Sequence, residues 1–175
     1  MADPEPGGRG DTAPTRPRRL LVVANQTLAG PELAEAVEER LRAGVHDVLV
    51  VVPATHSAAW RAQRYQWGMA GALGTPVPDL PVEDPEGERA ARERLDAALD
   101  RLRAAGVTAS GTLGAPDPME AVSDVLASTE VDEVLISTLP AGISKWLGLD
   151  LPKRIERRFH LPVRQVTAKA EPAAR

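Results

Sequence analysis

Short runs of consecutive apolar residues, separated by helical patterns, constrain the fold of this chain most. Residues 20–24 and 48–52 are apolar at every position, which is typical of strands covered on both faces, and residues 134–136 repeat the pattern. Residues 107–113 and 162–166 are the other predicted strands. Strands that alternate with helices form parallel sheets with right-handed crossovers. The sequence therefore predicts an α/β fold with a doubly wound, five-stranded parallel sheet and helices on both faces.

Amphipathic patterns between these runs predict the helices. Residues 31–43 have a leucine or valine at every fourth position, and residues 86–105 combine an apolar stripe with a charged face. Asp117 is expected to cap the next helix, with Pro118 at its first position. Asp150 is expected to be the N-cap of the last helix.

The chain is expected to hold a single domain. Residues 1–17 are rich in proline and glycine without apolar periodicity, so we expect a disordered N-terminal tail, and residues 169–175 are expected to form a flexible C-terminal tail. Residues 18–168 form the predicted α/β domain. A long insertion at residues 54–85 interrupts it and is expected to be partly helical near residues 58–66.

Composition excludes several classes of protein. The chain has no cysteine, so a disulfide framework, a thiolate metal site and a cysteine nucleophile are excluded, and its three histidines limit metal chemistry. The formal net charge of −4 argues against nucleic acid as a partner. No run of about 18 apolar residues and no secretory signal are present, so we expect no membrane span and a cytoplasmic protein.

Polar side chains and glycines follow four of the predicted strands at their carboxyl ends, where doubly wound sheets bind ligands. After residues 134–136, a loop with hydroxyls, a glycine and a lysine leads into a helix, and backbone N–H groups in such a unit bind anions. No residue is predicted to be catalytic or to bind a metal. The predicted ligand-binding residues are Asn25, Gln26, Thr27, Val52, Thr55, Gly114, Ser137, Thr138, Gly142, Ser144 and Lys145.

Several of these features together resemble the universal stress protein family over about residues 19–168. They are the order of elements, the helix opening at residues 114–118, the apolar strand at residues 134–136 with its loop, and the closing Pro162-Val163 pair. The resemblance implies a Rossmann-like sheet in the order 3-2-1-4-5 and a homodimer formed through the last strand. The family contains members that bind ATP and members that do not, so the resemblance alone leaves ATP binding open. The family's fold is similar to that of the adenine-nucleotide α-hydrolase-like group.

The chain departs from the signature of the family's nucleotide-binding members. In those members an Asp ends the first strand, a Val ends the second, and Gly-x-x-Gly, nine residues and Gly-Ser/Thr follow the fourth. Here Asn25 replaces the Asp, Val51 or Val52 matches the Val, and Pro140 stands near the second glycine. Proline has no N–H, and Asp150 as an N-cap would occupy the helix donors and repel a phosphate. Standard ATP binding is therefore not expected.

Three functions remain open. The first is a noncatalytic stress-associated or regulatory protein that acts through homodimerisation and an unidentified protein partner. The second is a sensor that binds ATP, AMP or another adenine nucleotide or nucleoside at the carboxyl ends of the first and fourth strands. The third is a nucleotide hydrolase, which the missing glycine loop and the lack of an acid–base pair disfavour.

Other features have both a structural and a functional interpretation. His56 is either an exposed loop residue or a catalytic base. Trp60 and Trp67 either pin the insertion to the body or stack on an adenine ring or on a partner's side chain. A basic helical face is either solvated or binds RNA, acidic proteins or anionic lipid. The structural interpretation is favoured in each case, and the basic face consists of Lys153, Arg154, Arg157 and Arg158.

Overall fold

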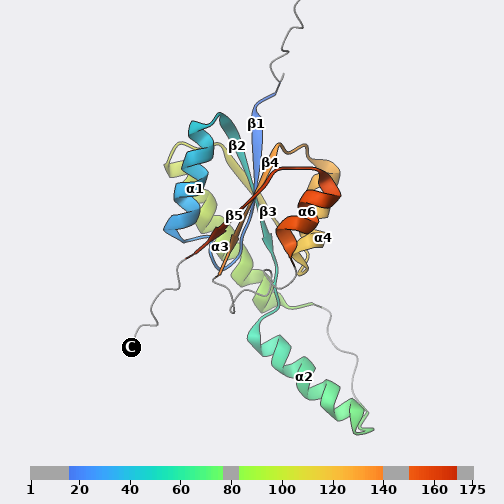
Figure 1. The fold of residues 1–175 in the computed structure, drawn as a ribbon. Helices are drawn as coiled ribbons and strands as arrows, with labels where there is room; N and C mark the ends of the chain where they lie inside the picture. The colour runs from blue at the N-terminus through green and yellow to red at the C-terminus, as the bar shows by residue number, and fades with distance from the viewer. Residues whose placement is uncertain (1–15, 77–82, 140–149, 169–175) are drawn as a thin grey trace, which may run out of the picture.

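A single parallel sheet organises the molecule (Figure 1). The structure is a computed structural model that describes residues 16–76, 83–139 and 150–168. The strand order is β3-β2-β1-β4-β5, and every neighbouring pair is parallel, which confirms the predicted fold class and sheet order. The strands are β1 (Arg18–Val23), β2 (Val45–Pro53), β3 (Ala109–Gly114), β4 (Glu133–Thr138) and β5 (Val163–Thr167).

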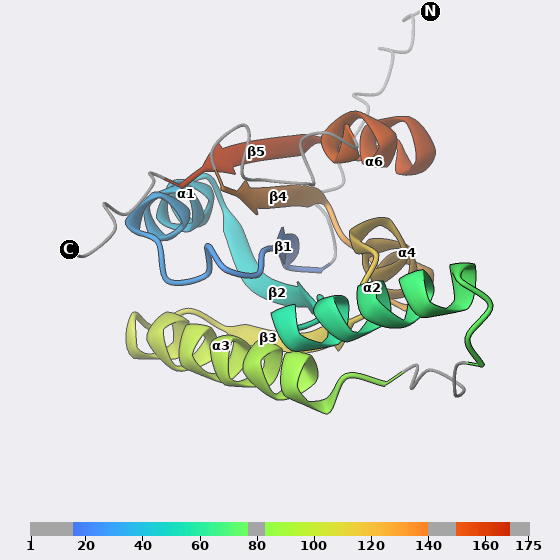
Figure 2. The ribbon, with the colours of Figure 1, turned by 90° about the horizontal axis from the view of Figure 1, so that it is seen from below.

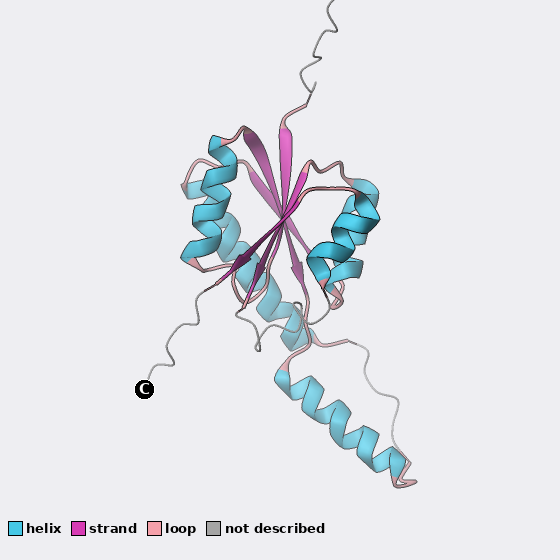
Figure 3. Ribbon diagram, viewed as in Figure 1, coloured by secondary structure: helices cyan, strands magenta, loops and turns pink. Residues whose placement is uncertain are grey.

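In the described ranges, helices cover both faces of the sheet (Figures 2 and 3). One face carries α1 (Pro31–Arg42) and α3 (Pro85–Ala104), and the other carries α4 (Pro118–Ser128) and α6 (Leu151–Phe159). A further helix, α2 (Ala58–Ala72), projects from the carboxyl edge of the sheet. None of the helices in the described ranges is both long and apolar enough to cross a membrane.

The interior of the sheet is buried on both faces, most completely along β1 and β4. Along β1, Leu20 and Val22 pack against α1 and α3, whereas Leu21 and Val23 pack against α4 and α6. This is the period-two alternation of a strand, with an apolar residue required at every position because both faces are covered. The runs of apolar residues thus mark β2, β1 and β4 as the interior strands of the sheet, and the carboxyl ends of β1 and β4 lie side by side.

Two predicted helix caps have different outcomes. Asp117 caps α4 as predicted, because its Oδ1 accepts hydrogen bonds from the N–H groups of Met119 at 2.8 Å and Glu120 at 3.0 Å. Asp150 is the N-cap residue of α6, as predicted, but the expectation that its carboxylate bonds the helix N–H groups is wrong. Asp150 has a left-handed backbone with φ of 49°, makes no side-chain cap, and places Oδ2 3.7 Å from Lys153 Nζ.

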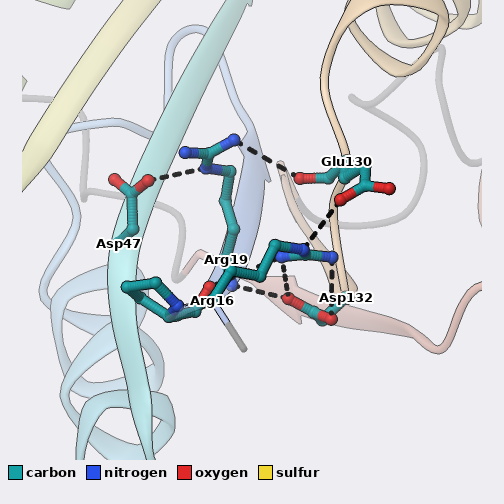
Figure 4. Close-up of polar contacts among 6 residues, drawn as sticks. Arg16, Arg19, Asp47, Glu130 and Asp132 are labelled. Atoms are coloured by element: carbon teal, nitrogen blue, oxygen red, sulfur yellow. Dashed lines mark hydrogen bonds and ion pairs between the residues drawn. The ribbon is translucent and has the colours of Figure 1, made fainter. Parts of the chain in front are cut away.

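A cluster of charged residues holds the amino end of β1 (Figure 4). Arg16 donates to both carboxylate oxygens of Asp132, at 2.9 and 3.2 Å, and the backbone N–H of Arg19 donates to Asp132 Oδ2 at 2.7 Å. Partial burial raises the pKa of Asp132, but the Arg19 N–H and the Arg16 guanidinium outweigh it, so the pKa lies below its ordinary value. The side chain of Arg19 pairs with Asp47 on β2. This cluster lies at the edge of the sheet opposite the predicted binding site.

Several predictions concern residues that the structure does not describe. The tails predicted at residues 1–17 and 169–175 lie outside the described residues, except for Arg16 and Pro17. The predicted ligand residues Gly142, Ser144 and Lys145, and Pro140 of the altered signature, also lie outside them.

Candidate functional site at the carboxyl edge of the sheet

The structure brings the residues after β1 together with the end of β4. Thr27 Oγ1 donates to the backbone oxygen of Ser137 at 3.1 Å, and both side chains are buried. Ser137 Oγ is buried without a hydrogen-bond partner among the described residues. Thr138 Oγ1 accepts a hydrogen bond from Gln165 Nε2 on β5 at 3.3 Å. Three of the predicted hydroxyls therefore lie at the junction of β1 and β4, and two of them are already engaged within the protein.

Asn25 is the most completely bonded residue of the predicted site. Its side chain is 5% exposed, and its Nδ2 group donates to the Pro53 oxygen at 2.9 Å and to Thr55 Oγ1 at 2.8 Å. Its Oδ1 accepts a hydrogen bond from Arg94 Nη1 at 2.8 Å. Both N–H groups and the oxygen of the amide are thus used inside the protein. Arg94, on α3, is a site residue that the sequence prediction missed.

Of three further predicted residues, two have structural surroundings and one is exposed. The Val52 side chain is fully buried in the core beside α1 and α3. A Cβ on Gly114 would come within 2.4 Å of Ala121 Cβ, so the glycine is required for the close packing of β3 on α4. Gln26 is exposed and borders a groove of about 400 Å³ together with Arg94. Of these three, only Gln26 presents a side chain to solvent.

A second polar cluster joins the starts of α2 and α3. The Asp84 carboxylate is 7% exposed and accepts hydrogen bonds from the backbone N–H and the hydroxyl of Ser57 and from the N–H of Gly87. Burial raises the pKa of Asp84, but these donors outweigh it and hold the pKa below its ordinary value. A Cβ on Gly87 would come within 2.6 Å of Asp84 Oδ2. One ionised carboxylate therefore fixes the beginnings of two helices.

His56, Ser57 and Asp84 lie together but do not form a catalytic triad. Ser57 Oγ accepts from the Trp60 N–H at 3.1 Å and donates to Asp84 Oδ1, so it acts as the N-cap of α2. His56 Nδ1 lies 3.8 Å from Asp84 Oδ2, which is beyond hydrogen-bonding distance. A triad would need the serine hydroxyl to donate to the imidazole. The cluster has the geometry of a helix cap.

The tryptophan rings of the insertion have different surroundings. Trp60 stacks on His56 with ring centroids 3.5 Å apart and an interplanar angle of 11°. Trp67 lies farther along α2, and α2 has no buried residue. Trp67 is partly buried, and the expectation that its ring packs on the body stays a prediction, although α2 projects from the body (Figure 1). No group of three His, Asp or Glu side chains able to hold a metal ion occurs in the described ranges.

Comparison with known proteins identifies the fold. No protein-family model matches the sequence, and no curated protein gives a significant match. Among solved structures, the chain is similar to the universal stress protein from Archaeoglobus fulgidus, with a TM-score of 0.54 and 18% sequence identity. The similarity covers 85% of this chain and 92% of that one. At this level of identity the similarity defines the architecture, and the chain therefore has the fold of a universal stress protein.

Proposed function

We propose that the chain is a noncatalytic, stress-associated regulatory protein of the universal stress type, that it acts in the cytoplasm through contacts with other proteins, and that it does not bind ATP in the standard way. The observation that carries this proposal is the internal use of the Asn25 amide. A ligand that engaged this amide would first break its bond to Arg94. A hydrogen bond to a charged group contributes roughly 1.5–3 kcal/mol, so the arrangement opposes a ligand there.

Homodimerisation through β5 is part of the proposal. β5 is an edge strand, because it pairs with β4 on one side and ends the sheet order on the other. An open edge presents unpaired backbone groups that a second copy can pair with across a twofold axis. Val163 and Val166 are partly buried, while Arg164, Gln165 and Thr167 are exposed. We therefore expect sedimentation analysis to give a mass near twice 18.6 kDa. A monomer at micromolar concentration would contradict this part of the proposal.

A nucleotide or nucleoside sensor is the second candidate function. The observation that favours it is the buried Ser137 hydroxyl, which has no hydrogen-bond partner among the described residues and lies beside Thr27. Buried polar groups are normally hydrogen-bonded. A ligand at the ends of β1 and β4 would supply a partner for this hydroxyl.

Thermal unfolding with ATP, AMP, cyclic AMP and adenosine separates the two functions. We expect no change in the Tm of the wild-type protein with any of them. A ligand at a hundredfold excess over its Kd would stabilise the protein by about 2.7 kcal/mol, which corresponds to roughly 5–10 °C for a chain of this size. A shift that Asn25→Ala and Ser137→Ala both remove would contradict the proposal and favour the sensor. Arg94→Ala is the matched variant, since it frees the Asn25 oxygen while leaving Asn25 itself in place.

A further inference from the structure

Among the described helices, α2 alone has no buried residue. It leaves the body at the carboxyl edge of the sheet, and its far end lies well away from the other helices (Figure 1). The exposed large hydrophobic residues of the described structure all belong to this segment: Tyr65 is 72% exposed, Met69 51% and Leu73 82%. Their spacing of four residues places them on one side of the helix. Exposed apolar residues grouped in this way mark an interaction surface.

Beyond Trp60, which stacks on His56 at the base of α2, the cationic, aromatic and large apolar side chains follow one another toward the tip. Arg61 and Arg64 lie in the half of the helix nearest the body, and Tyr65 and Trp67 follow them. Residues 68–74 form the far end and contain only Gly, Ala, Met and Leu. The same order, from cationic to aromatic to apolar, is met on passing from the lipid headgroups through the interface into the acyl chains. The segment is therefore matched to the depth profile of a lipid leaflet.

Most of the backbone polar groups in the last turn of α2 are hydrogen-bonded within the tip itself. The N–H groups of Leu73, Gly74 and Thr75 donate to carbonyl oxygens of residues 69–71 at 3.0–3.2 Å. Gly74 has a φ of 77°, the left-handed conformation with which helices commonly end. Polar backbone groups are costly to remove from water unless they are hydrogen-bonded, so these bonds reduce the cost of placing the tip in an interface.

The charge of the segment favours an anionic surface. Residues 54–76 contain Arg61 and Arg64 but no Asp or Glu, so this segment carries +2 while the remainder of the chain carries −6, given the net charge of −4. A helix of 15 residues is about 22 Å long, which exceeds the screening length of roughly 8–10 Å at physiological salt. The tip of α2 therefore lies beyond the screening length from the acidic body, whereas Arg61 and Arg64, the fourth and seventh residues of the helix, lie within about 10 Å of its base.

We propose that α2 docks on an anionic lipid surface, with its tip at residues 65–74 in the interface and Arg61 and Arg64 near the lipid phosphates. A second copy of the chain is a poorer occupant, because pairing two α2 helices would bring four arginines together without a carboxylate. The exposed stripe from Tyr65 to Leu73 also spans only about 12 Å, too short for the ~800 Å² that each partner buries in a stable protein interface.

Flotation of the full-length protein with lipid vesicles tests the proposal. We expect it to bind vesicles of phosphatidylglycerol and phosphatidylcholine mixed one to two, and to bind phosphatidylcholine alone roughly thirtyfold more weakly, since two arginines near an anionic surface each contribute about fivefold. In a Trp146→Phe background, where Trp60 and Trp67 are the remaining tryptophans, emission is expected to shift to shorter wavelength on binding. Absence of binding to the anionic vesicles would overturn the proposal.

Variants on two helices locate the surface. Met69→Glu combined with Leu73→Glu is expected to abolish vesicle binding, and Arg61→Gln combined with Arg64→Gln to remove the preference for anionic lipid. These side chains are not buried, so the Tm should remain close to the wild-type value. Arg154→Gln combined with Arg158→Gln, on the basic face of α6, is the matched control and should bind normally.

Loss of binding in this control but not in the α2 variants would overturn the proposal. So would lipid-free self-association that the Met69 and Leu73 substitutions abolish, since it would assign the surface to a second copy.

Discussion

Arg40→Ala is expected to lower the free energy of unfolding by about 3 kcal/mol, measured by urea denaturation at neutral pH. Its partner, Glu133, is the first residue of β4 and is 3% exposed. Arg40 Nε and Nη2 both donate to Glu133 Oε2, at 2.9 and 2.6 Å. Without this guanidinium, the Glu133 carboxylate would remain buried and would lose both hydrogen bonds to Oε2. Breaking a buried ion pair in this way typically costs about 3–5 kcal/mol.

The lower end of that range applies because Glu133 has a second cationic neighbour. Arg164 on β5 places Nε 3.3 Å from Glu133 Oε1, at ion-pair distance although no hydrogen bond forms there. Glu133 therefore links α1, β4 and the edge strand that is proposed to form the dimer. Loss of Arg40 leaves part of this linkage in place.

A double variant serves as the control for the Arg40 prediction. Arg40→Met combined with Glu133→Leu is expected to recover most of the lost stability, because apolar residues of similar size replace a buried pair at little cost or with a gain. If Arg40→Ala changed the free energy of unfolding by less than about 0.5 kcal/mol, as a typical surface substitution does, the carboxylate would not depend on this partner.

The central sheet could be predicted from the sequence because burial on both faces demands apolar residues at every position. The run at residues 20–24 and the run at residues 134–136 both belong to strands with fully buried interiors. The edge strand β3 has no buried residue, and its predicted range of 107–113 is displaced from the observed Ala109–Gly114. Weak apolar patterning at the edges therefore limits the accuracy of strand boundaries.

The helix in the insertion is longer than predicted. We expected helix near residues 58–66, whereas α2 continues to Ala72 through Gly68 and Gly71. Glycine in a helix interior costs about 1 kcal/mol relative to alanine, so the glycines argued for a loop. Alanine and long side chains between them favour helix, and this local preference prevails although α2 receives no support from the core.

The pairings within the candidate site could not be predicted from the sequence. Asn25 was identified as a site residue from its position after an apolar strand, but its partner Arg94 lies 69 positions away on α3. Outside the site, the pair formed by Glu133 and Arg40 was also missed, because these residues are 93 positions apart. Local patterns predict which residues end strands, whereas the side chain that reaches them depends on how helices pack across the sheet.

Asp84→Ala is expected to lower the free energy of unfolding by about 2–3 kcal/mol. The substitution removes the acceptor for the N–H groups of Ser57 and Gly87, at the starts of α2 and α3. Loss of a helix cap typically costs about 1 kcal/mol, and a buried donor left without a partner costs roughly 1–3 kcal/mol. Glu83→Ala, which replaces the exposed neighbouring carboxylate, is the matched control and should change stability by less than about 0.5 kcal/mol.

The pH dependence of this effect follows from the lowered pKa of Asp84. Because the folded-state pKa lies below the unfolded value of about 3.9, the contribution of the carboxylate is complete above that value and is lost as the pH falls through the folded-state pKa. The difference in stability between wild type and Asp84→Asn is therefore expected to be constant from neutral pH to about pH 5 and to shrink below pH 4 in urea denaturation experiments. A difference that grew on acidification would require a raised pKa. If Asp84 acts as a helix cap, its substitution lowers stability with this acid dependence. If it belonged to a Ser-His-Asp catalytic unit, its substitution would abolish hydrolysis and leave stability unchanged.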